Sequence, residues 1–207
     1  MEDKFQFSAS DLIKKSAAQI KYLQLRRELY RKRLTENCQR GVNYQAKMAC
    51  KLEAAEEYRG TYCQNDIVIY FCNDLVTARK IVEVKSVVGA VESWYFESSL
   101  LQTAFYKAML MLSNGWLFTP KFRIKEGYAR NKIQVNPLID YHLLFGNKEY
   151  KIIIPTIEDA KIIVNFFVQK ASIIAKGSWD EARSFDSKYK FKQYEALNNH
   201  FKYNLVR

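Results

Sequence analysis

The sequence contains few of the residues that build flexible or cross-linked proteins. Among 207 residues there are only 7 glycines and 3 prolines, too few for long disordered linkers. The 4 cysteines include no CxxC pair; they are Cys38, Cys50, Cys63 and Cys72. Without closely spaced pairs, neither a zinc site nor a disulfide framework is expected. We therefore expect a cytoplasmic, intracellular protein with reduced thiols.

Long apolar runs and acidic residues are also scarce. The N-terminal sequence lacks the apolar stretch of a signal peptide, and no segment reaches the length needed to cross a bilayer. We therefore expect no membrane partner. Only 22 Asp and Glu stand against 33 Lys and Arg, which leaves a net charge of +11. Such a surplus favours a polyanionic partner, above all nucleic acid.

Periodic apolar patterning, by contrast, runs through the whole chain. Apolar residues at helical spacing predict a basic helix from Ser8 or Ser10 to about Gly41, and a second helix over 44–58. A strand over 66–72 is predicted to end in a turn at Asn73-Asp74. The remaining predicted elements are a strand over 79–87, a helix over 97–113, short strands over 116–124, 131–136, 141–145 and 150–154, and helices over 156–176 and 186–203.

This order of elements predicts a single α/β domain over 1–207, in which helices flank a mixed central β-sheet. Within it we expect a helical N-terminal part over 1–58. The sheet and its central helix are expected over 60–155, and C-terminal helices over 156–207.

Two charged residues interrupt one of the apolar predicted strands. Glu83 and Lys85 are two positions apart, so both side chains leave the same face of the strand. Charges on one face of an apolar strand need a reason, because burying an unpaired charge is costly. An edge strand with a solvated face and a cross-strand ion pair would explain Glu83 and Lys85. It would not explain Asp66 on the neighbouring strand.

A catalytic interpretation uses Asp66, Glu83 and Lys85 together. Carboxylates from neighbouring strands can hold Mg²⁺ or Mn²⁺ through oxygen ligands, and the backbone carbonyl of Val84 would complete the metal shell. The metal would polarise a phosphate and acidify a bound water. The ammonium group of Lys85 would orient that water or neutralise charge in the transition state.

The order Asp66, sixteen residues, Glu83-x-Lys85, sixteen residues, Gln102-x-x-x-Tyr106 resembles the RecB-like branch of the PD-(D/E)XK nuclease superfamily. The segment Phe7-Ser8-Ala9-Ser10-Asp11-Leu12 is similar to the Ser-x-Ser start of many members. Over roughly residues 7–110, the resemblance implies a restriction-endonuclease-like core and a Mg²⁺- or Mn²⁺-dependent deoxyribonuclease, acting as an endonuclease, an exonuclease or both. It also implies that Gln102 and Tyr106 help to position the lysine and the nucleic-acid strand.

The chain departs from this family in two ways. Members often carry a His or Glu before the Asp as a further metal ligand, and here no His precedes His142. We expect Glu53 to take that role, with Glu57 as the alternative; a solvated helix carboxylate explains either residue equally well. Relatives, CRISPR-associated ones among them, hold an iron–sulfur cluster with C-terminal cysteines. No Cys follows Cys72, so no cluster is expected.

The resulting expectation is a small DNA-processing nuclease, of a cell or a virus, that prefers single-stranded DNA or DNA ends. That preference is assigned to Tyr106, whose ring would stack on an unpaired base. The alternatives are a non-catalytic nucleic-acid-binding protein, favoured by aromatic residues among the C-terminal lysines, and a nuclease that acts on RNA. No triad-like spacing surrounds His142 or His200, and both are assigned to structure or surface.

Overall fold

The computed structural model describes residues 5–25, 43–49, 55–87, 92–113, 115–118, 132–189 and 192–206. Its strands are β1 (Phe5–Ser8), β2 (Ala55–Gln64), β3 (Ile67–Val76), β4 (Lys80–Lys85), β5 (Trp116–Phe118), β6 (Lys132–Gln134), β7 (Asp140–Phe145), β8 (Lys148–Ile153) and β9 (Lys202–Leu205). Its helices are α1 (Ala9–Lys14), α2 (Ala17–Leu25), α4 (Ser93–Leu112), α5 (Ile157–Lys176), α6 (Trp179–Tyr189) and α7 (Gln193–Leu197), with a 3-10 turn at Asn198–His200 and a short helix over 43–49.

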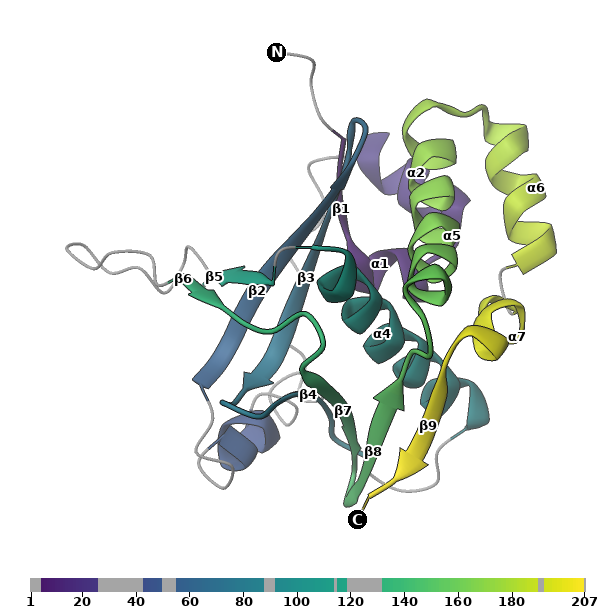
Figure 1. Ribbon diagram of the computed structural model, residues 1–207. Helices are drawn as coiled ribbons and strands as arrows, with labels where there is room; N and C mark the ends of the chain where they lie inside the picture. The colour runs from purple at the N-terminus through teal and green to yellow at the C-terminus, as the bar shows by residue number, and fades with distance from the viewer. Residues whose placement is uncertain are drawn as a thin grey trace.

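Within the described residues, all the strands belong to one mixed sheet (Figure 1). Its order is β6-β5-β2-β3-β4-β7-β8-β9, and β1 pairs with β3 beside this path. The β1–β3 and β4–β7 pairs are parallel, and the other pairs are antiparallel. Helices flank this sheet, which confirms the predicted single α/β domain with a mixed sheet.

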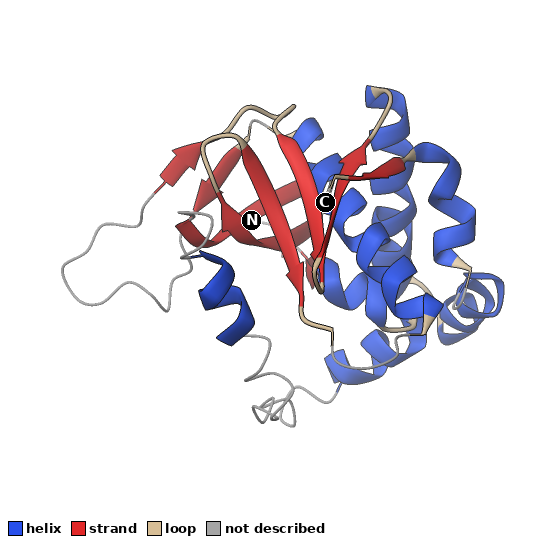
Figure 2. Ribbon diagram, turned by 90° about the horizontal axis from the view of Figure 1, so that it is seen from below, coloured by secondary structure: helices blue, strands red, loops and turns tan. Residues whose placement is uncertain are grey.

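The two faces of the sheet carry separate apolar clusters. The larger cluster joins Ile81 of β4 to α4 and α5, which lie together on one side of the sheet (Figure 2). Every residue of α4 from Ser99 to Leu110 is buried, including the polar residues Ser99, Gln102, Thr103 and Lys107, so α4 is enclosed on all sides by the rest of the fold. The smaller cluster joins Val82 and Val84 to Met48 of the helix over 43–49. Because neighbouring strand residues alternate between faces, that short helix covers the opposite face.

Charged side chains tie the N-terminal helices to the C-terminal ones. Asp186 of α6 accepts hydrogen bonds from the backbone N–H groups of Ala17 and Ala18 at the start of α2, at 2.6 and 2.9 Å. Lys170 of α5 is fully buried and donates to the carbonyls of Leu12 and Lys15 at the end of α1. Unpaired backbone groups at helix ends need such partners when they are shielded from water.

Several predicted elements were wrong. The helix expected over 44–58 is described as a helix only over 43–49, and β2 occupies residues 55–58, so the N-terminal part over 1–58 contains strands as well as helices. The long helix expected from Ser8 or Ser10 is instead β1, α1 and α2 as far as residue 25. The C-terminal helix expected over 186–203 is broken, and it ends in strand β9. Among the described helices, none is long and apolar enough to span a bilayer.

Candidate active site

The candidate site lies where β4 meets the middle of α4. Glu83 and Lys85 leave the same face of β4, as predicted, and their side chains form an ion pair. That face is the one toward α4, because the amide Nε2 of Gln102 donates to Glu83 Oε1 at 2.7 Å. Glu83 is only 2% exposed, so its charge depends on these partners rather than on water. The edge-strand interpretation is wrong, since β4 pairs with β3 on one side and with β7 on the other.

A second carboxylate, Asp74, reaches the same place from β3. Val76 of β3 pairs with Ile81 of β4. Asp74 and Glu83 each lie two residues farther from the β3–β4 turn than this pair, so both side chains leave the same face of the sheet. The backbone N–H of Val84 donates to Asp74 Oδ2 at 2.8 Å. This bond replaces a β3–β4 backbone bond at the point where the two strands separate.

Asp66, which the sequence analysis placed in this site, lies elsewhere. It occupies the turn between β2 and β3, next to Asn65 with its positive φ of 53°. There it forms an ion pair with Lys176 at the end of α5, which lowers the pKa of its carboxyl group. Eight strand positions separate it from Asp74, or roughly 26 Å at about 3.3 Å per residue. The expectation that Asp66 lies beside Glu83 was therefore wrong, and the aspartate next to Glu83 and Val84 is Asp74.

Gln102 and Tyr106 of α4 lie side by side, as their spacing of four predicts. The Gln102 amide Nε2 donates both to Glu83 and, at 2.9 Å, to the hydroxyl oxygen of Tyr106. Both residues are 3% exposed, so this pair lies behind the carboxylates rather than on the surface. The prediction that the Tyr106 ring stacks on a base does not fit, because Phe71 contacts that ring at a centroid distance of 5.7 Å.

The absence of a side chain at Gly60 permits this arrangement. Gly60 pairs with Phe71 across β2 and β3, and a Cβ atom placed on it would lie 2.1 Å from Phe71 Cζ. That distance is far inside van der Waals contact. The Phe71 ring therefore lies over the backbone of β2, and glycine is required there for lack of space.

Electrostatics keep Lys85 charged and Tyr106 neutral. Burial lowers the pKa of Lys85, but the attraction of Glu83 and Asp74 outweighs it and the net shift is upward. Burial, reinforced by the same two carboxylates, raises the pKa of Tyr106 well above its usual value. At neutral pH Lys85 is therefore an ammonium group and Tyr106 is a phenol, beside the acidic side chains of Asp74 and Glu83.

The donor groups suit a hard divalent cation. Glu83 Oε2 and Gln102 Oε1 are buried and have no hydrogen-bond partner, which is a costly state for a carboxylate oxygen unless a ligand completes it. The backbone N–H of Val84 points toward Asp74. Because the N–H and the carbonyl of one strand residue point to the same edge of the strand, the Val84 carbonyl also points toward β3 and Asp74. Two carboxylates and a carbonyl are ligands that Mg²⁺ or Mn²⁺ accepts. No set of three or more acidic, His or Cys side chains that could hold a metal occurs in the described ranges.

The proposed extra ligand cannot be placed. Glu53 lies outside the described residues, and Glu57 lies on β2, where its backbone alone is described. Cys63 and Cys72 form no disulfide, while Cys38 and Cys50 lie outside the described residues.

Both histidines bind carboxylates away from the site. His142 Nδ1 lies 2.6 Å from Glu149 Oε1 and His200 Nδ1 lies 2.9 Å from Asp159 Oδ1. Burial lowers the pKa of His142, and Lys80 also forms an ion pair with Glu149. Neither carboxylate belongs to the Asp74–Glu83 pair, which agrees with a structural role for both histidines.

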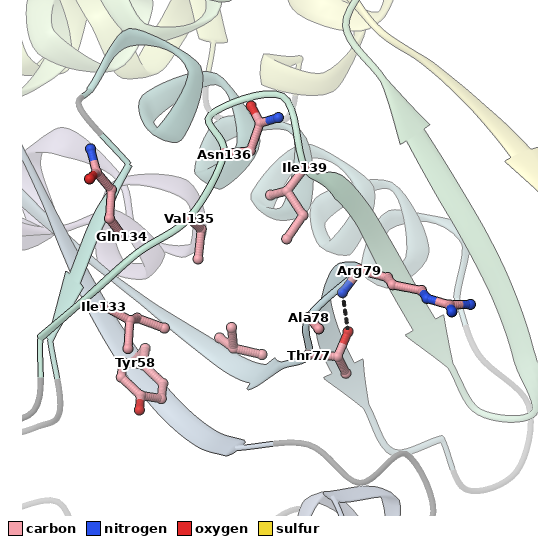
Figure 3. A pocket seen from close by; sticks show the side chains of 10 residues that line it. Tyr58, Thr77, Ala78, Arg79, Ile133, Gln134, Val135, Asn136 and Ile139 are labelled. Carbon is pink, nitrogen blue, oxygen red and sulfur yellow. Dashed lines mark hydrogen bonds between the residues drawn. The ribbon is translucent and has the colours of Figure 1, made fainter.

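A pocket of about 640 Å³ opens beside the β3–β4 turn (Figure 3). Its wall includes Tyr58, Thr77, Arg79 and Asn136, and none of its described residues carries a carboxylate. Thr77 Oγ1 accepts from the N–H of Arg79 at 3.3 Å and from that of Lys80 at 2.9 Å. These bonds fix the turn that directs β4 back beside β3, so this pocket lies next to the candidate site without sharing its acidic groups.

Comparisons with known proteins add little. No family model matches the sequence, and no curated protein matches it. Among solved structures, the crystal structure of SSO0001 aligns over 93% of this chain and 86% of its own chain, with a TM-score of 0.48 and 12% identity. At that level of similarity the alignment carries no argument about function.

Proposed function

We propose that the chain is a metal-dependent deoxyribonuclease of the PD-(D/E)XK type. The observation that supports this proposal is the convergence of Asp74, Glu83 and Lys85 from two adjacent strands, with Gln102 bound to Glu83 from behind. Glu83 is buried and Asp74 is half-buried on the same face of the sheet, and neighbouring carboxylates shielded from water are unfavourable unless a cation neutralises them. A lysine alone does not meet that need, because Glu83 Oε2 has no hydrogen-bond partner.

Each group of the site has a defined role in this proposal. Asp74, Glu83 and the Val84 carbonyl would hold Mg²⁺ or Mn²⁺, which supplies an acidified water and polarises the scissile phosphate. Lys85 acts as a fixed positive charge beside the phosphate, because its raised pKa keeps it protonated. Gln102 fixes the rotamer of Glu83, and Tyr106 fixes Gln102; both are positioning residues.

The charge balance favours nucleic acid as the substrate. The chain carries a net charge of +11, and a phosphate backbone gains affinity from each Lys or Arg that neutralises it. We assign DNA as the substrate, with single strands or free ends preferred. An RNA substrate and binding without catalysis are the two alternatives that the assay must separate.

The test is a digestion assay on matched substrates. Purified protein is incubated with circular and linear single-stranded DNA, duplex DNA and RNA, in Mg²⁺, Mn²⁺ or EDTA, with Glu83→Gln protein in parallel. We expect metal-dependent cleavage of DNA that is absent in EDTA and in Glu83→Gln. Cleavage of RNA alone would change the substrate class. Binding without cleavage in either metal would contradict the catalytic proposal.

A further inference from the structure

The inference begins at an uncovered stretch of β3 beside the candidate site. Strand β2 pairs along one edge of β3, so β1 and β4 must share the other edge. Strand β1 covers residues 67–70 and β4 covers residues 75–76. Within the described part of the chain, residues 71–74 have no partner strand on that edge, and Asp74 lies at the end of this gap.

A cavity of about 340 Å³ opens at the gap. Its wall is formed by the end of β1 and the start of α1, by adjacent residues of β2 and β3, and by α4; the residues used below are Ser8, Ser10, Arg59, Tyr70, Cys72 and Tyr106. Tyr106 belongs to the network that ends at Glu83. Cys72, which lines the cavity, precedes Asp74 by two residues in β3. The cavity therefore adjoins the catalytic carboxylates.

The wall of this cavity suits a ligand with negative charge and an aromatic ring. The Arg59 guanidinium is on an exposed side chain opposite Cys72, and Tyr70 is 38% exposed. The Ser8 and Ser10 hydroxyl oxygens lie 3.2 Å apart, and the Ser8 side chain makes no cap hydrogen bond to α1. Among the described residues that line the cavity there is no Asp or Glu. Hydroxyls and a guanidinium bind phosphate oxygens, and an exposed tyrosine ring stacks on bases.

We propose that this cavity binds one unpaired nucleotide of the substrate strand next to the scissile phosphate. Arg59, Ser8 and Ser10 hold its phosphate, and Tyr70 stacks on its base. This inference rests on the proposed nuclease function and deepens it, because it names the residues that select a single strand. A paired base is already stacked on its neighbours and cannot reach Tyr70 without unpairing.

Binding is measured separately from cleavage, in the full chain carrying Glu83→Gln. Fluorescence anisotropy gives the affinity for a labelled thymidine 12-mer and for a blunt duplex in Ca²⁺. Adding Tyr70→Ala or Arg59→Gln should weaken binding of the single strand about tenfold or more, with a much smaller effect on the duplex. Matched controls are Tyr22→Ala, an exposed tyrosine on α2, and Arg183→Gln on α6, which should leave the single-strand affinity unchanged.

A second readout distinguishes contact from misfolding. Single methylphosphonates, which remove the charge of one phosphate, are placed in turn along the 12-mer. In the Glu83→Gln parent, one internal position should weaken binding most, and Arg59→Gln should abolish that sensitivity. Equal affinity of Tyr70→Ala, Arg59→Gln and their parent would overturn the subsite, as would equal losses on single strand and duplex.

The proposed nucleotide subsite and the proposed nuclease activity can be disproved independently of each other. Cleavage that depends on Glu83, with no effect of Arg59→Gln or Tyr70→Ala on binding, would overturn the subsite alone. Selective single-strand binding through Tyr70, with no cleavage by wild-type protein in any metal, would overturn the nuclease while the binding site stands.

Discussion

At the scale of the residue, one amide side chain organises the candidate site. The Gln102 amide group donates to both Glu83 and Tyr106, so neither the carboxylate nor the phenol can turn without losing a bond. The same amide leaves its own oxygen buried and without a partner, which a structural role alone does not explain. In the proposed site, the role of Gln102 is to orient Glu83.

A substitution of Gln102 should therefore alter metal affinity more than the chemical step. In Gln102→Leu the Glu83 carboxylate loses its fixed orientation, and loss of a hydrogen-bond partner behind a metal ligand costs about 10–100-fold in affinity. We expect the Mn²⁺ concentration for half-maximal cleavage to rise by that factor, with most of the rate recovered at saturating metal. Tyr106→Phe, which keeps the ring, should show a smaller shift. An unchanged metal dependence in Gln102→Leu would refute the positioning role.

His142 predicts a pH dependence of stability. Burial lowers the pKa of its imidazole, although Glu149 partly opposes that shift. On falling pH the unfolded chain therefore takes up this proton first, near pH 6.5, and the folded state loses stability from there down to the lowered pKa. The extra stability from Glu149, whose own pKa is lowered, is present above its unfolded pKa and is lost only at more acidic pH.

Urea unfolding of wild type and His142→Gln between pH 7.5 and 5 measures this effect. The free energy of unfolding of the wild type should fall with decreasing pH below about 6.5, and the variant should fall less over the same window. Parallel curves for the two proteins would show that His142 is not the group responsible.

At the scale of the element, the β2–β3 hairpin explains both what the sequence predicted and what it missed. The sequence predicted that four of the residues share faces, because Glu83 and Lys85 are two apart on one strand and Gln102 and Tyr106 are four apart on one helix. Asp74 was missed because Asn-Asp is a common turn pair, whereas the actual turn is held by the Thr77 hydroxyl, three residues after Asp74. Strand β2 was missed because its first residues favour a helix, and only pairing with β3 overrides that preference.

The close contact between Gly60 and Phe71 tests this hairpin. Gly60→Ala places a methyl group where the Phe71 ring lies, so the ring must move and the contact with Tyr106 must change. We expect destabilisation of about 1–3 kcal/mol, the usual cost of overpacking, measured by urea denaturation. In the presence of Phe71→Leu the same glycine substitution should cost less, giving a measurable coupling energy. An additive double mutant would contradict the packing described.

The junction between α2 and α6 provides a second test at this scale. Asp186→Ala removes the carboxylate that accepts from Ala17 and Ala18, and loss of an N-terminal cap costs about 0.5–2 kcal/mol. The melting temperature should fall by several degrees. Asp180→Ala, a highly exposed residue of the same helix, is the matched control and should leave it nearly unchanged. Equal melting temperatures for both variants would remove this capping role.

At the scale of the whole molecule, the sheet brings distant segments to one site. Strands β3 and β4 supply the charged groups, α4 closes the back of the site, and β1 and α1 bound the adjoining cavity. A metal that binds only the folded chain must stabilise the whole fold. Mn²⁺ should therefore raise the melting temperature of the wild type but not of Glu83→Gln. An equal rise in both proteins would place the metal elsewhere.

The most direct measurement compares the same substitution at two aspartates of one hairpin. Cleavage rates of Asp74→Asn and Asp66→Asn are determined at saturating Mn²⁺ on single-stranded DNA. Asp74 lies beside Val84 and Glu83, whereas Asp66 pairs with Lys176 at the far end of β3. We expect Asp74→Asn to cleave no faster than Glu83→Gln, and Asp66→Asn to keep most of the wild-type rate. Full activity of Asp74→Asn together with an inactive Asp66→Asn would contradict the site.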